Sequence, residues 1–200
     1  MKWDRVRIGD VCQIIGGTTP DSGNPDYWGG DVVWVTPTDL GKLDSWVIVD
    51  SARKLSDAAV AEVGLPLVPA GSVVMSSRAP IGHLAIAGRD LRTNQGCKSF
   101  ACSERIDPEF LFLTLRHRMN EIRALGSGAT FVEVSKSVLE GFDIHIPDVE
   151  AQRLIAARLK NQLAAVHSAR KSARAQLEEI ERLPARLLAR AFEFHGDSDD

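Results

Sequence analysis

Residues 148–194 decide the organisation of the chain, and they read DVEAQRLIAARLKNQLAAVHSARKSARAQLEEIERLPARLLARAFEF. The stretch contains no glycine and is rich in Ala, Leu, Arg, Glu and Gln, which favour helix. Its apolar residues recur at alternating spacings of four and three, as in a coiled coil. Arg170 and Pro184 interrupt an otherwise apolar stripe of Ala156, Leu159, Leu163, Val166, Ala173, Leu177, Ile180, Leu187, Ala191 and Phe194. We therefore predict one long helix over residues 148–195 that needs a helical partner.

The length of this helix supports that prediction. At about 1.5 Å per residue it would span roughly 70 Å, more than one small domain can cover. The alternative is a helix that folds back onto its own domain. Proline lacks a backbone N–H, so Pro184 is expected to kink the helix or end it locally. Residues 196–200 are expected to form a disordered acidic tail.

Residues 1–147 have a different texture, with short β-branched runs separated by Gly, Pro, Asp and Asn. Such runs are typical of strands. Helical character is confined to residues 56–62 and 108–125. The strands are predicted at residues 31–35, 46–49, 71–75, 82–87 and 142–146. The predicted fold class is α+β, with one globular mixed domain followed by a long C-terminal coiled-coil helix.

Composition agrees with one domain plus an extension, because the 200 residues are 44% hydrophobic. The N-terminus is charged where a signal peptide would be apolar, and no run approaches the roughly 18 apolar residues of a membrane helix. A soluble cytoplasmic protein without membrane contact is expected. The net charge is −3, yet residues 53–98 hold six Lys and Arg against three acids. That segment either supplies a basic face or is an ordinary mixed surface.

The chain lacks the motifs of a catalyst. Gly16–Gly23 is followed by Asn24 instead of the Lys-Ser/Thr of a phosphate loop, and no G-x-S-x-G elbow occurs. The three cysteines and five histidines do not show zinc-site spacing, so reduced thiols and no metal are expected. Asp148 and Glu150 faintly resemble part of a nuclease metal site, but the lysine is missing and capping of the helix explains them better. We predict no enzymatic activity and no cofactor in this chain.

A series of short segments nevertheless occurs in a characteristic order. It comprises Trp3, Ile8–Val11, Gly16–Pro20, Tyr27–Gly30, Trp34–Leu40, Pro69–Val74, Ser76–Gly82 and Thr93–Gly96. This order resembles the target-recognition domain of type I restriction-modification specificity subunits. The helix resembles the spacer helix of that family through Pro147, Glu150–Gln152, Ile155–Ala156, Leu159 and Leu183–Pro184. Family members usually have two such domains and two helices, so this chain resembles a half-subunit.

The resemblance implies a function in DNA recognition. Residues 1–147 would form a DNA target-recognition domain that binds double-stranded DNA and directs a methyltransferase (M) subunit and a translocating endonuclease (R) subunit. S-adenosylmethionine, ATP and Mg would then belong to those partners. The missing second half favours a homodimer that binds a bipartite site, with the helices pairing through Leu159, Leu163, Val166, Ala173, Leu177, Ile180 and Leu187. Alternatives are a regulatory or decoy half-subunit, a metal-dependent nuclease, and an adaptor that uses the helix alone.

Two groups of residues are candidates for contact with DNA. Motif residues shared with relatives that read other sequences should touch phosphates or fix loops. These are Thr18, Thr19, Ser77, Arg78, Asn94, Gln95 and Lys136. Base edges would be read by donors outside the motifs, in segments 42–45 and 89–92 and at residue 98. These donors are Lys42, Arg89, Arg92 and Lys98.

Overall fold

The computed structural model describes residues 2–126 and 132–193. The chain divides into two compact units, Met1–Ala156 and Ala157–Asp200. The first contains every described strand and the beginning of the long helix, whereas the described part of the second is the remainder of that helix.

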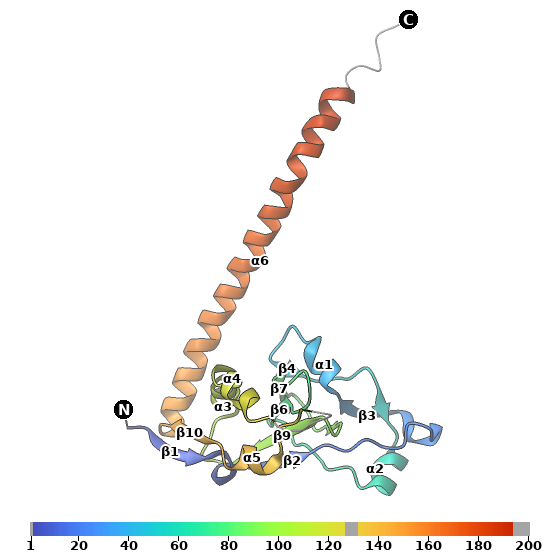
Figure 1. The fold of residues 1–200 in the computed structure, drawn as a ribbon, viewed down its shortest axis with the longest axis vertical. Helices are drawn as coiled ribbons and strands as arrows, with labels where there is room; N and C mark the ends of the chain where they lie inside the picture. Colours follow the sequence, from blue (N-terminus) through green and yellow to red (C-terminus); the bar gives the residue numbers. More distant parts are fainter. Residues whose placement is uncertain (1, 127–131, 194–200) are drawn as a thin grey trace, which may run out of the picture. The chain divides into compact units, whose positions relative to one another are not determined.

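Within the described residues of the first unit, the strands form three sheets (Figure 1). The largest has the order β2-β9-β6-β7-β4, and the others are β5-β3-β8 and the pair β1-β10. Their ladders are antiparallel except β3 with β8 and β4 with β7. The strands are β1 (Asp4–Arg7), β2 (Cys12–Gly16), β3 (Trp28–Val35), β4 (Val47–Ile48), β5 (Lys54–Leu55), β6 (Val73–Ser76), β7 (Leu84–Ala87), β8 (Arg92–Thr93), β9 (Cys97–Cys102) and β10 (Asp143–Ile146).

Short helices cover these sheets. Among them, α3 packs on β6 and β7, and its buried Leu111 and Leu115 share a core with Phe100 of β9. The smaller core under α2 includes Trp34, Leu55 and Ala59. The helices are α1 (Pro37–Gly41), α2 (Asp57–Val63), α3 (Pro108–His117), α4 (Met119–Ala124), α5 (Lys136–Glu140) and α6 (Val149–Glu193), with 3-10 turns η1 (Ile8–Asp10) and η2 (Pro25–Tyr27).

The predicted α+β class is confirmed. All five predicted strands are present, as β3, β4, β6, β7 and β10, and residues 56–62 fall on α2 with its cap. The helical segment 108–125 is divided into α3 and α4 at Arg118, whose backbone leaves the helical region. Five described strands, β1, β2, β5, β8 and β9, and two short helices, α1 and α5, were not predicted.

The beginning of α6 is fixed to the first unit. Asp148 caps it, because its Oδ1 accepts a hydrogen bond from the Ala151 amide at 2.8 Å. Gln152 is fully buried, and its Nε2 donates to the carbonyl oxygens of Arg105 and Pro147 while its Oε1 accepts from the Asp107 amide. The first compact unit extends to Ala156 and so includes the beginning of α6.

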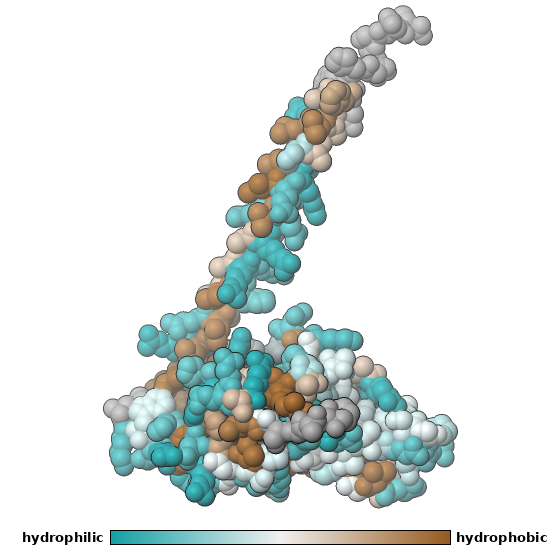
Figure 2. Space-filling model, in the orientation of Figure 1, coloured by the Kyte–Doolittle hydropathy of each residue, from teal (hydrophilic) through white to brown (hydrophobic). Residues whose placement is uncertain are grey.

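The rest of α6 has an apolar stripe, and Figure 2 shows apolar side chains recurring among hydrophilic ones along it. Val166, Leu177, Ile180 and Leu187 are at least half exposed. The helix continues through Pro184, so of the two expected effects, a kink or a local end, the local end is contradicted. A proline removes one intrahelical hydrogen bond but leaves those of the flanking turns.

The predicted tail, 196–200, lies outside the described residues. No described helix is long and apolar enough to cross a membrane.

Candidate nucleic-acid interface

Three loops that are far apart in the sequence meet in the first unit. They are residues 17–20 after β2, 77–80 after β6, and 94–98 around the start of β9, and we call them the loop junction. The Thr18 amide donates to the Thr93 carbonyl oxygen at 2.9 Å, and the Asn94 Nδ2 donates to the Thr19 Oγ1 at 3.1 Å. The Ser77 amide donates to the Gly96 carbonyl oxygen at 2.8 Å. Three of the segments that carry the family resemblance in the sequence are therefore in contact in the fold.

The loops of the junction approach one another backbone to backbone. Asn94 holds its own loop closed, because its Oδ1 accepts from the Gly96 amide at 2.5 Å. A Cβ placed on Gly17 would lie 2.0 Å from the Asn94 carbonyl oxygen, well inside van der Waals contact. Glycine is therefore required at position 17 by the close approach of the two chains.

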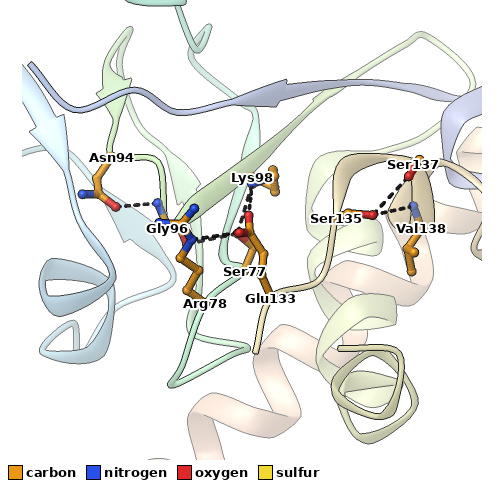
Figure 3. A network of polar contacts seen from close by, with 9 residues as sticks. All are labelled: Ser77, Arg78, Asn94, Gly96, Lys98, Glu133, Ser135, Ser137 and Val138. Carbon is orange, nitrogen blue, oxygen red and sulfur yellow. Dashed lines mark hydrogen bonds and ion pairs between the residues drawn. The ribbon is translucent and has the colours of Figure 1, made fainter. Parts of the chain in front are cut away.

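An ion-pair network connects two loops of the junction (Figure 3). Glu133 accepts from the Arg78 Nε at 2.8 Å through one oxygen and from the Lys98 Nζ at 2.7 Å through the other. The Lys98 Nζ also lies 3.3 Å from the Ser77 Oγ. The Val134 amide donates to the Ser77 carbonyl oxygen, which pairs the two segments through their backbones as well. One carboxylate therefore connects two cations from separate loops.

Burial makes this network energetically important. Lys98 is only 8% exposed and Ser77 is fully buried. Burial raises the pKa of Glu133, but hydrogen bonds from Lys98 and Arg78 outweigh that effect and hold the pKa below its ordinary value. The carboxylate is consequently ionised at neutral pH, and it is the counter-charge for a largely buried ammonium.

Glu133→Gln is expected to reduce the free energy of unfolding by about 2 kcal/mol at neutral pH, because the buried Lys98 ammonium loses its counter-charge. The stabilisation by a carboxylate with a lowered pKa is present above its unfolded pKa and is lost as the pH falls through the folded one, so the difference should shrink below about pH 4. Urea unfolding at several pH values measures this. Glu140→Gln is the control, because the Glu140–Lys136 pair is 3.6 Å long and exposed. Equal losses in both variants would contradict the account.

A family model described as the type I restriction modification DNA specificity domain matches residues 1–179 of this chain. The chain belongs to that family. The match includes all three loops of the junction and most of α6. Family membership confirms the resemblance to type I specificity subunits.

Curated relatives and solved structures agree with the specificity-subunit family. The chain is 36% identical over 159 residues to the type I restriction enzyme MjaIX specificity subunit of Methanocaldococcus jannaschii, covering 78% of this chain and 37% of the relative. A putative MjaX specificity subunit of the same organism is 31% identical over 93% of this chain and 41% of its own length. The chain thus spans about two fifths of the curated relatives it matches.

Two solved structures have the same fold. The first comes from work titled as the structural basis of complex assembly and conformational transition of the type I R-M system. It matches with a TM-score of 0.72 and 25% identity, over 90% of this chain and 44% of the other. The second, the HsdS subunit from Thermoanaerobacter tengcongensis, matches with a TM-score of 0.65 and 24% identity, over 84% and 39%.

In this specificity-domain chain, the structure places most of the predicted DNA-contacting residues at the loop junction. Arg92, on β8, directly precedes the Thr93 carbonyl that holds Thr18. Lys42 is the C-cap of α1 and Lys136 begins α5, where it pairs with Glu140, so these two and Arg89 lie outside the junction as defined. The predicted residues within the junction are Thr18, Thr19, Ser77, Arg78, Asn94, Gln95 and Lys98.

The junction also shows what the sequence did not reveal. Glu133 was not predicted, and it is separated from Arg78 and Lys98 by 55 and 35 positions along the chain. Lys98 was predicted to read bases, but its ammonium is buried and paired inside the protein. The half-exposed guanidinium of Arg78 is paired with the same carboxylate. Lys98 is therefore placed to support the loops of the specificity domain from within.

Neither a metal cluster nor a reactive thiol is associated with the junction. Across residues 2–126 and 132–193, no group of three or more His, Cys, Asp or Glu is placed to hold a metal ion. Burial raises the pKa of the Cys97 thiol to about 12. A hydrogen bond with Cys102, together with burial, raises the pKa of Cys12. Both thiols are therefore protonated at neutral pH and are poor nucleophiles.

Proposed function

We propose that this chain is the DNA-reading half of a type I restriction-modification specificity subunit. It forms a homodimer through α6 and directs methyltransferase (M) and endonuclease (R) partners to a bipartite site on double-stranded DNA. The observation that supports this most strongly is the specificity-domain match over residues 1–179, which spans the domain and most of the helix together. S-adenosylmethionine, ATP and Mg act in the partner subunits.

Within the domain, we assign the junction loops to phosphate contact and to the shape of the surface. Thr18, Thr19, Asn94 and Gln95 hold or flank these loops, and their side-chain hydroxyl and amide groups suit phosphate oxygens. Arg78 contributes its half-exposed guanidinium to a phosphate. These contacts fix the register of the protein on the duplex without selecting a sequence.

Base reading is assigned to Arg92 ahead of Lys42 and Arg89. The Arg92 Nε and Nη1 are buried and have no hydrogen-bond partner among the described residues, and desolvation lowers the pKa of the guanidinium. Unpaired buried donors are costly, and unlike Lys98 this side chain has no internal partner to lose among the described residues, so turning outward to pair with guanine O6 and N7 would satisfy them on binding. Arg92→Ala is therefore expected to change the preferred base at one position of the target.

The homodimer is proposed from the stripe on α6. Its predicted contact residues Val166, Leu177, Ile180 and Leu187 are at least half exposed in the single chain. Pairing of two antiparallel copies would bury this stripe and relate two recognition domains by a two-fold axis. A two-fold protein matches a target with two inverted half-sites.

Reconstitution of methyl transfer tests the proposed function against a regulatory or decoy half-subunit. Adding the chain to its methyltransferase subunit, with S-adenosylmethionine and duplex DNA, should produce methylation confined to one target sequence. A decoy would bind the methyltransferase or a second specificity subunit without supporting methylation. Cleavage of DNA by the chain alone with Mg, abolished by one point substitution within it, would instead establish a nuclease.

A further inference from the structure

Arg53 is an exposed residue outside the loop junction, and its guanidinium lies against two tryptophan rings. The guanidinium carbon of Arg53 lies 3.4 Å from the centroid of the Trp28 ring and 5.8 Å from that of Trp34. The two indoles are packed edge to face, with centroids 5.1 Å apart. In the part of the chain that the structure describes, this guanidinium has no hydrogen bond or ion pair. Its N–H groups are thus available while its plane is fixed by the indole.

Hydrogen bonds to backbone carbonyl oxygens hold both indole rings in place. The Trp28 Nε1 donates to the Asp21 carbonyl oxygen at 3.2 Å, and the Trp34 Nε1 donates to the Thr18 carbonyl oxygen at 3.1 Å. Thr18 belongs to the loop junction, so the aromatic platform and the junction share one framework.

The backbone on either side of Arg53 is also tethered. Ser51 Oγ accepts from the Trp34 amide at 2.9 Å and donates to the Arg53 carbonyl oxygen at 2.7 Å. The Ala52 amide donates to the Asp39 Oδ1 at 3.0 Å, and the other oxygen of that carboxylate closes the capping box of α1. Main chain and side chain are therefore both ordered before any ligand arrives, which lowers the entropic cost of binding.

We propose that Arg53 is a specificity-determining residue that reads a guanine edge in the DNA major groove, with Trp28 as its platform. The proposal rests on the proposed function, because it requires the first unit to dock on duplex DNA. A guanidinium offers two parallel N–H groups that match guanine O6 and N7, and the same fork also matches phosphate oxygens. Guanine is favoured because a phosphate needs only a positive charge, whereas base reading gains from a fixed plane.

The test compares the targets that the full-length protein and its variants select from randomised duplex DNA. Arg53→Ala and Arg53→Lys should both lose the preference for guanine at one position and bind the wild-type target roughly ten- to hundredfold more weakly. Lysine keeps the charge but not the planar fork, so its failure to rescue separates a guanine contact from a phosphate contact. Arg116→Ala, at an exposed position of α3, is the matched control and should leave the target unchanged.

The outcomes are distinct. Loss of one base preference in both variants, with unchanged thermal unfolding, supports the proposal. Uniform weakening across all sequences, largely restored by lysine and with a salt dependence reduced by about one phosphate, would identify a phosphate contact and overturn it. Unchanged selection would overturn it too. If the wild-type protein selects no sequence at all, the proposed function fails first.

Discussion

Replacing Leu163 and Leu177 together with aspartate is expected to convert the protein into monomers and to weaken its binding to the full DNA target by about a hundredfold or more. Both side chains lie on the apolar stripe of α6, where two carboxylates would have to be buried at the proposed dimer interface. DNA affinity falls because a monomer engages one half-site and loses the gain from linked binding. Light scattering measures the oligomeric state, and titration with labelled duplex measures the affinity.

The matched control places the same two charges elsewhere on α6. Asn161→Asp with Ala175→Asp adds two carboxylates, each two residues from a stripe position and so about 200° around the helix from it. This variant should remain dimeric and bind DNA as the wild type does. A dimeric Leu163→Asp, Leu177→Asp protein would show that the stripe serves another partner, and equal effects in both variants would indicate a nonspecific effect of charge.

Gly17→Ala is expected to destabilise the first unit by about 3 kcal/mol or more and to abolish sequence-selective DNA binding at physiological temperature. The added methyl group would lie 2.0 Å from the Asn94 carbonyl oxygen and 2.5 Å from that of Thr93. Both obstacles are backbone atoms, so the loops of the junction must separate to accommodate it. Urea unfolding measures the loss of stability, and selection from randomised duplex measures the loss of recognition.

The preceding residue provides an internal control for that experiment. A Cβ on Gly16 has no neighbour within 4 Å, although Gly16 is adjacent in sequence and pairs with Lys98 in the β2–β9 ladder. Gly16→Ala should change stability by less than about 0.5 kcal/mol. If the two variants behave alike, the close approach of loops 17–20 and 94–98 is not important for the domain.

The parts of the fold that were predictable have a local signal. A β-branched run indicates β3, and a glycine-free apolar repeat indicates α6. The strands β2 and β9 were missed because their sequences, CQIIG and CKSFAC, mix polar residues into strands that lie side by side in the largest sheet. Five residues are too few to show helical periodicity in α1, although Thr36, Pro37 and Asp39 spell its capping box.

The sequence indicated which segments form the loop junction, but it did not indicate which of their side chains pair with one another. The motif order identified the loops that meet at the junction, because those segments resemble a known family. No local pattern indicates that Glu133 pairs with Arg78 and Lys98, since the partners come together only through the tertiary fold. The position of Arg53 on Trp28 is likewise a tertiary contact, because α1 and β4 lie between β3 and the segment that carries Arg53.

Selection of targets from randomised duplex DNA by the purified chain with its methyltransferase subunit measures whether a two-fold dimer of this chain reads DNA. We expect enrichment of two identical, inverted half-sites separated by an unread spacer, with their centres about 34 to 36 Å apart. The length of that spacer should not vary between selected molecules, because the paired helices set it. Enrichment of one continuous asymmetric sequence would contradict the two-fold arrangement, and the absence of any enriched sequence would contradict DNA reading by this chain.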